Sequence, residues 1–217
     1  MKPLRIAWEL ATPIIVPDAP IHLDSLLSWA RVDEATQAGE ADPLALQHDL
    51  PLERLTTLIG WCFKASWLTF DWAGEPRLFH YARRSDPTEF ADAFSDGLLS
   101  KKPRWNGASG CTKGYSLNLQ ERFASHATAY AIGDVDGVCD LLGRVPSLGK
   151  LRRLSKGWIK HVTVEQIDRS ACHWFLRNLP TDAEEHDASY ATAAGCLRAP
   201  YWNDRHGFVK MPVEANF

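Results

Sequence analysis

Hydrophobic and polar residues alternate at the start of the chain. In residues 4–10 every second position is hydrophobic, which is typical of a half-buried β-strand: Leu4, Ile6, Trp8 and Leu10. Three prolines between residues 13 and 20 end this strand and prevent a helix there. The hydrophobic spacing then becomes i, i+3, i+4, i+7, which predicts an amphipathic helix, at Leu23, Leu26, Leu27 and Ala30.

The middle of the chain predicts a second strand and a long insertion. Residues 61–72, WCFKASWLTFDW, are rich in aromatic and β-favouring side chains and predict a strand that ends at AGEP. A weaker strand pattern covers residues 77–84, and Asp86 followed by proline opens a short predicted helix. Residues 100–117 have no periodicity and contain three glycines and a proline, so they predict a long surface loop.

The last regular pattern repeats the order of the first. Residues 126–132 predict a strand, and Asp134 is a suitable N-cap for a helix that ends at Gly143. A glycine-rich basic loop follows, and residues 158–165 predict the closing strand. After Ile167 the pattern indicates a helix or loop, an acidic linker and a terminal segment.

The order strand, helix, strand, insertion, strand, helix, strand predicts an α/β protein of the α+β type with a ferredoxin-like core and an antiparallel sheet. We expect a single domain over residues 1–217. The core covers about 1–72 and 126–166, the basic insertion covers 73–125, and a C-terminal extension covers 167–217.

Composition narrows the class of protein. With 217 residues, 45% hydrophobic and 24% charged, the chain is an ordinary globular protein with enough residues for a core. A membrane span is excluded because no apolar run approaches the ~20 residues required, and the amino terminus lacks the apolar core of a signal peptide, so we expect cytoplasmic residence. The five scattered cysteines indicate reduced thiols without a zinc pattern, and we expect no metal and no cofactor.

The charges are segregated, although the net charge is only −3. Residues 101–160 contain 11 Lys and Arg against four Asp and Glu, whereas the rest of the chain is acidic. A basic region on an acidic protein indicates a local polyanion site, and a solvated loop is the alternative. Two clusters make up the region. The first is Gly149, Lys150, Arg152, Arg153, Lys156 and Gly157, and the second is Lys101, Lys102, Arg104, Trp105, Lys113 and Tyr115.

Three segments resemble a known family. Residues 129–165, AYAIGDVDGVCDLLGRVPSLGKLRRLSKGWIKHVTVE, resemble the glycine-rich segment of the RAMP superfamily of CRISPR proteins. Residues 13–30, PIIVPDAPIHLDSLLSWA, and 197–202, LRAPYW, resemble the RAMP subunit of type IV CRISPR effector complexes. The loop departs from the family pattern because only Gly157, rather than a glycine pair, precedes the last strand.

The resemblance implies a non-catalytic subunit that grips the 5′ handle of the guide RNA and caps one end of the subunit filament. It also implies contacts with backbone RAMP subunits and with a large subunit, and target DNA within reach in the complex. The two clusters agree with this function. Lys and Arg bind phosphates, arginine can bind them in a bidentate manner, and aromatic side chains stack on unpaired bases.

Two alternatives stay open from the residues. Some RAMP relatives are metal-independent endoribonucleases with a catalytic histidine. The candidates here are His22, His126, His161 and His173, of which His22 and His126 are the better placed to face a bound strand. The other alternative is a protein-interaction adaptor whose basic loop meets an acidic partner without RNA. The sequence lacks the phosphate-binding, zinc-protease and serine-hydrolase motifs GxxxxGK[ST], HExxH and GxSxG.

Overall fold

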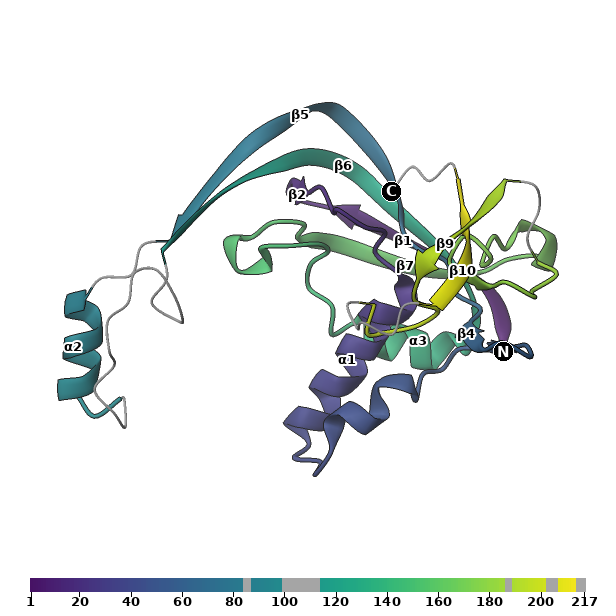
Figure 1. Ribbon diagram of the computed structural model, residues 1–217, viewed down its shortest axis with the longest axis horizontal. Helices are drawn as coiled ribbons and strands as arrows, with labels where there is room; N and C mark the ends of the chain where they lie inside the picture. The colour runs from purple at the N-terminus through teal and green to yellow at the C-terminus, as the bar shows by residue number, and fades with distance from the viewer. Residues whose placement is uncertain (84–86, 99–113, 186–188, 202–206, 214–217) are drawn as a thin grey trace. The chain divides into compact units, whose positions relative to one another are not determined.

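The computed structural model describes residues 1–83, 87–98, 114–185, 189–201 and 207–213. The chain divides into two compact units (Figure 1). One unit contains Met1–Glu75 and Arg122–Phe217, and the other is Pro76–Glu121, which falls within the expected 73–125 insertion. None of the described helices has both the length and the apolar character needed to cross a membrane.

Several regular elements match those that the sequence pattern predicts. The predicted strands at 4–10 and 158–165 and the helices predicted from Leu23 and after Asp134 are confirmed. They are β1 (Lys2–Leu10), β7 (Ile159–Gln166), α1 (Leu23–Gln37) and α3 (Val135–Leu142). Asp134 caps α3 as predicted, because its side chain accepts a hydrogen bond from Gly137 N at 3.0 Å.

The main sheet has five strands. Its other members are β2 (Ile14–Ile15), β5 (Thr69–Arg83) and β6 (Tyr115–Gly133). β1 lies between β6 and β7 and is antiparallel to both, while β6 also pairs with β2 and β5. This order and the two intervening helices agree with the predicted ferredoxin-like α+β fold with an antiparallel sheet.

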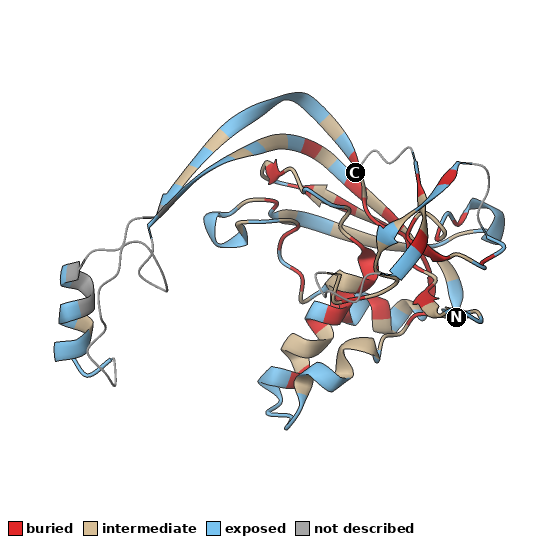
Figure 2. Cartoon of the chain, in the orientation of Figure 1, coloured by how far each residue is buried: buried red, intermediate tan, exposed pale blue. Residues whose placement is uncertain are grey.

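One face of this sheet forms the main core with α1 and α3 (Figure 2). Leu4, Ile6 and Trp8 on β1 are fully buried, and they belong to one cluster with Leu27 of α1 and Leu142 of α3. The alternation in residues 4–10 therefore arises because the helices cover one face of β1 and do not cover the opposite face.

The second predicted strand is wrong in its bounds. Residues 61–72 divide into β4 (Trp61–Phe63) and the beginning of β5, and β4 pairs with β3 (Arg54–Thr56) rather than with the main sheet. Between them the chain changes direction: Ala65 forms an isolated bridge with Ala131, and Trp67 forms one with His22. A short 3₁₀ helix, η1 (Pro43–His48), precedes β3.

The C-terminal extension is also more regular than predicted. Three short strands, β8 (Leu179–Pro180), β9 (Tyr190–Gly195) and β10 (Gly207–Pro212), form an antiparallel sheet in the order β8-β10-β9. A second apolar cluster joins this extension to Ile132 of β6 and includes Trp174. The extension therefore packs against β4 and β6, since Cys62 and Ile132 belong to the same cluster.

The unit Pro76–Glu121 contains the end of β5, the beginning of β6 and α2 (Pro87–Ser95), which confirms the short predicted helix. Its strands are held in part by side chains: His80 Nδ1 lies 2.8 Å from Asn118 Oδ1. Most described residues of β5 after Trp72 are exposed (Figure 2). None of the described residues of this unit belongs to either apolar cluster.

Candidate nucleic-acid interface

The basic residues 147–158 lie on the loop that joins α3 to β7. Backbone hydrogen bonds close the base of this loop: Leu148 N donates to Gly157 O at 2.8 Å, and Ile159 N donates to Pro146 O at 3.0 Å. The loop is therefore a closed structure rather than an open connection.

The segment after β1 holds the loop from a second side. Gly157 N donates to Pro13 O at 2.8 Å. Thr12 Oγ1 donates to Ser155 O at 2.7 Å and accepts from Trp158 N at 2.9 Å. Because these bonds join segments far apart in sequence, the fold determines where the basic residues lie.

Glycine is required at two positions of the loop. Gly149 and Gly157 have φ angles of +79° and +63°, in the region that side chains disfavour. A Cβ at residue 157 would lie 2.0 Å from Leu148 O, and one at residue 149 would lie 2.9 Å from Ile14 Cγ1. Since Gly157 also donates its N–H to Pro13 O, this glycine shapes the loop.

The turn that presents two arginines is strained at both ends. It is the 3₁₀ turn η3 (Arg152–Leu154), flanked by Leu151 and Ser155 with φ angles of 57° and 56°. Non-glycine residues in this conformation are uncommon and cost on the order of 1–3 kcal/mol each. The surrounding hydrogen bonds hold this turn in place.

The four cations of the loop have different surroundings; they are Lys150, Arg152, Arg153 and Lys156. Lys150 forms an ion pair with Asp18. The Arg152 guanidinium lies over the indole of Trp29, 4.6 Å from the ring centroid. Arg153 is exposed, and Lys156 is half-buried.

Lys150 and Arg152 border a hollow of about 530 Å³. Its other walls come from residues 17–21 and from one side of α1, where Ser25, Leu26 and Trp29 face the space. The walls are mainly apolar, so the loop places positive charge at the rim of an apolar surface. The sequence did not indicate Trp29 as a site residue, because its spacing on α1 resembles that of core positions.

The second predicted cluster falls largely outside the described residues. This applies to Lys101, Lys102, Arg104, Trp105 and Lys113, while Tyr115 begins β6 without a described side chain. The two clusters also belong to different units.

The histidines considered as catalytic groups lie in contrasting places. His22 is 4% exposed and stacks on Tyr201 with ring centroids 4.0 Å apart. Burial, and to a lesser extent the charge of Arg177, lowers the pKa of His22 well below its ordinary value. His126 is exposed on β6, directly across from Glu9 of β1.

A buried ion pair fixes the C-terminal extension against α1. Arg177 and Asp24 are both fully buried, and Arg177 Nη2 lies 3.4 Å from Asp24 Oδ2. Tyr201 Oη donates to the same carboxylate at 2.9 Å. The remaining guanidinium hydrogens go to backbone oxygens of Asn178, Phe63, Ala65 and Leu197. Burial by itself would lower the pKa of Arg177, but the nearby Tyr201 and Asp24 raise it, so the charge is retained.

A family model, that of the CRISPR type IV associated protein Csf3, matches residues 2–214. The chain belongs to this family. No similar protein was found among curated sequences. The match supports the sequence prediction of a type IV CRISPR subunit, and it places the protein among the subunits of type IV effector complexes, which work together with other Csf proteins.

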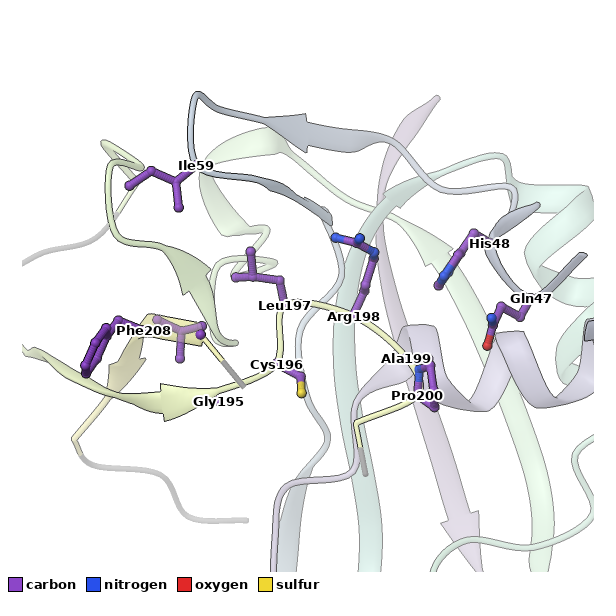
Figure 3. A pocket seen from close by; sticks show the side chains of 12 residues that line it. Gln47, His48, Ile59, Gly195, Cys196, Leu197, Arg198, Ala199, Pro200 and Phe208 are labelled. Carbon is purple, nitrogen blue, oxygen red and sulfur yellow. The ribbon is translucent and has the colours of Figure 1, made fainter. Parts of the chain in front are cut away.

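A second hollow of this Csf3-family protein lies between η1 and the C-terminal extension (Figure 3). It measures about 370 Å³ and is lined by both polar and apolar side chains, among them His48, Arg198, Ile59 and Phe208. The Arg198 guanidinium lies 4.3 Å from the centroid of the Trp61 ring. Ile59 and Phe208 are 61% and 75% exposed, so an apolar surface adjoins this hollow.

Proposed function

We propose that this protein is the RAMP-type subunit of its type IV effector complex that binds the 5′ handle of the guide RNA and caps one end of the subunit filament, without catalysing a reaction. One observation carries the proposal: a rigid loop presents four cations beside an apolar hollow. A single-stranded RNA combines phosphates with unpaired bases and would use both features.

The arginines of η3 suit phosphate binding in particular. A guanidinium can donate two parallel hydrogen bonds to phosphate oxygens, whereas lysine acts as a point charge. The exposed Arg153 and the adjacent Arg152 can therefore orient a bound phosphate. Lys150 and Lys156 add positive charge. The predicted residues at 101–115 are a separate RNA contact in the proposal, on the other unit.

Protein partners would use other surfaces. The turn between β3 and β4 exposes Leu58 fully and Ile59 by 61%. The turn is fixed, because the backbone N–H groups of both residues donate to Asp182 Oδ2, at 3.0 and 3.3 Å. We infer that exposed apolar surfaces of this kind meet the backbone RAMP subunits and the large subunit, which brings target DNA near this protein in the complex.

The test is equilibrium binding of the purified chain to labelled guide RNA, with and without the handle, across a salt series. We expect handle-dependent binding that weakens steeply with salt. Replacement of Lys150, Arg152, Arg153 and Lys156 by alanine should lower the slope of log affinity against log salt by about 0.7 per lost phosphate contact, so by up to about 3.

A matched control replaces two exposed cations elsewhere in the same unit, Lys2 and Arg169. This double variant is compared with Arg152→Ala/Arg153→Ala and should bind like the wild type. Equal and weak binding to both RNAs, unchanged in the loop variants, would contradict the proposal and favour the protein-interaction adaptor.

A guide-processing ribonuclease is the second candidate, and the exposure of His126 beside Glu9 favours it. It predicts cleavage of precursor RNA at the handle boundary, lost in His126→Ala with binding retained. Intact RNA after prolonged incubation with the wild type would argue against it.

A further inference from the structure

The hollow beside the basic loop has a construction that a phosphate grip alone does not explain. Three separate segments enclose its 530 Å³: residues 17–21, one side of α1, and residues 147–152 of the loop. Ser25 and Trp29 are one helical turn apart, so they lie on the same side of α1 with Leu26 next to them. A surface that only attracted phosphates would not need such an enclosure.

The walls of the hollow are held in fixed positions. Two prolines, Pro17 and Pro20, restrict the first segment, and Leu68 N donates to Ile21 O at 2.8 Å at its end. The ion pair between Lys150 and Asp18 joins the loop to that same segment. The hollow is thus formed before a ligand arrives, which reduces the entropic cost of binding.

The hollow has a mainly apolar interior and a charged rim, which correspond to the flat base and the charged phosphate of a nucleotide. Inside, the surfaces are mainly proline, alanine, isoleucine and leucine side chains and the indole of Trp29, which is 37% exposed. At the rim are the cations Lys150 and Arg152 and the Asp18 carboxylate that pairs with Lys150. The Arg152 guanidinium lies 4.6 Å from the centroid of the Trp29 ring, so positive charge adjoins the aromatic side chain.

We propose that this hollow binds one unstacked base of the RNA handle. The base lies against Trp29, and Arg152 and Lys150 contact the phosphates on either side of it. This inference rests on the proposed function and adds to it a defined position in the RNA. Ser25 Oγ already donates to His22 O at 2.7 Å, so the hollow offers few specific hydrogen bonds and should accept any of the four bases.

The test is a scan of the labelled handle RNA in which each nucleotide in turn is made abasic, with the full chain as binder. Stacking of one base on an aromatic side chain corresponds to a loss of roughly 5- to 160-fold in affinity when the base is removed. We expect such a loss at one position, with little change when that base is exchanged for another.

Variants at Trp29 assign that position to the hollow. Trp29→Ala should weaken binding of the intact RNA by a similar factor, and combining it with the critical abasic RNA should cause no further loss. Trp29→Phe should restore most of the affinity. Trp158→Ala is the matched control, because Trp158 is 48% exposed at the end of the same loop but does not line the hollow.

The two proposals fail in different ways. A scan without a sensitive position, or losses from Trp29→Ala and the abasic RNA that multiply, would overturn the base-binding inference. If the loop variants still lose handle-dependent binding in that case, the proposed function stands. If they do not, the proposed function fails as well.

Discussion

The surroundings of a single residue in this protein determine its chemical behaviour more than its residue type does. His22, near the start of α1, looks from the sequence like a group able to act on RNA, but it is buried between Tyr201 and Trp67. Its Nδ1 atom has no hydrogen-bond partner among the described residues. A buried histidine of this kind is neutral in the folded protein, because burial penalises its charged form.

The first prediction concerns the acid stability that follows from His22. Its pKa is lower in the folded than in the unfolded state, so the unfolded state binds more protons below the ordinary value of about 6.5. Stability should therefore fall as the pH falls below 6.5, by up to about 1.4 kcal/mol per pH unit from this residue.

His22→Phe keeps a flat ring next to Tyr201 and removes the titration. Urea unfolding between pH 7.5 and 5 should show a flatter pH dependence in this variant than in the wild type. An identical slope in His22→Phe and the wild type would contradict the prediction.

At the scale of helices and strands, some elements follow from the local sequence pattern and others depend on tertiary packing. β1, α1, α3 and β7 were predicted because one of their faces is buried and the other is not, and this leaves a period in the sequence. Residues 61–72 carry strand-favouring side chains throughout, so their composition does not show the break between β4 and β5. That break comes from non-local bonds such as Ser66 N to Tyr130 O at 2.8 Å.

The second prediction concerns the geometry of the basic loop. Gly157→Ala places a Cβ 2.0 Å from Leu148 O at a φ of +63°, so backbone must move. We expect a loss of about 2–4 kcal/mol in the free energy of unfolding, from strain and overpacking together, and weaker binding of handle RNA.

Gly39→Ala is the matched control for this variant. Gly39 has a φ of +75° with nothing within 4 Å of the added Cβ, so it tests the strain alone. Its loss should be about 1–2 kcal/mol, with RNA binding unchanged. Equal losses in the two variants would show that the clash with Leu148 is relieved at little cost.

At the scale of the whole molecule, the two compact units differ in what stabilises them. Both apolar clusters are made of residues from Met1–Glu75 and Arg122–Phe217. In Pro76–Glu121, by contrast, Leu78 is 72% exposed and Leu98 is 76% exposed. A two-stranded ribbon with so little burial is marginally stable by itself.

The third prediction is that replacement of Pro76–Glu121 by a short glycine-containing turn leaves the larger unit folded. Its melting temperature, followed by circular dichroism, should change by only a few degrees because no cluster residue is removed. Handle RNA should bind more weakly, since the predicted contacts at residues 101–115 are lost while the basic loop is kept.

Because the basic loop stays intact in this deletion variant, its folding and its RNA binding can each contradict part of the prediction. Loss of cooperative unfolding would show that the larger unit depends on Pro76–Glu121. Unchanged RNA binding would remove the second cluster from the proposed interface and leave the loop as its main part.

The alternating strand and amphipathic helix patterns, the predicted α+β class, the segregation of charge and the resemblance to type IV CRISPR subunits all follow from the sequence without the structure. The strand and helix patterns depend on residues two to four positions apart, and the other features depend on the order of residues along the chain, so none of them needs a contact between distant segments. The closing loop at 147–158 was also recognisable from its glycines and cations.

The residues that lie beside that loop are known only from the fold. Trp29 lies near Arg152 because α1 and η3 come together across more than 100 residues, and nothing local distinguishes it from a core tryptophan. Arg177 has the composition of a surface cation, but it is fully buried against Asp24. Such contacts arise from packing between distant segments. This packing leaves no periodic pattern in the local sequence.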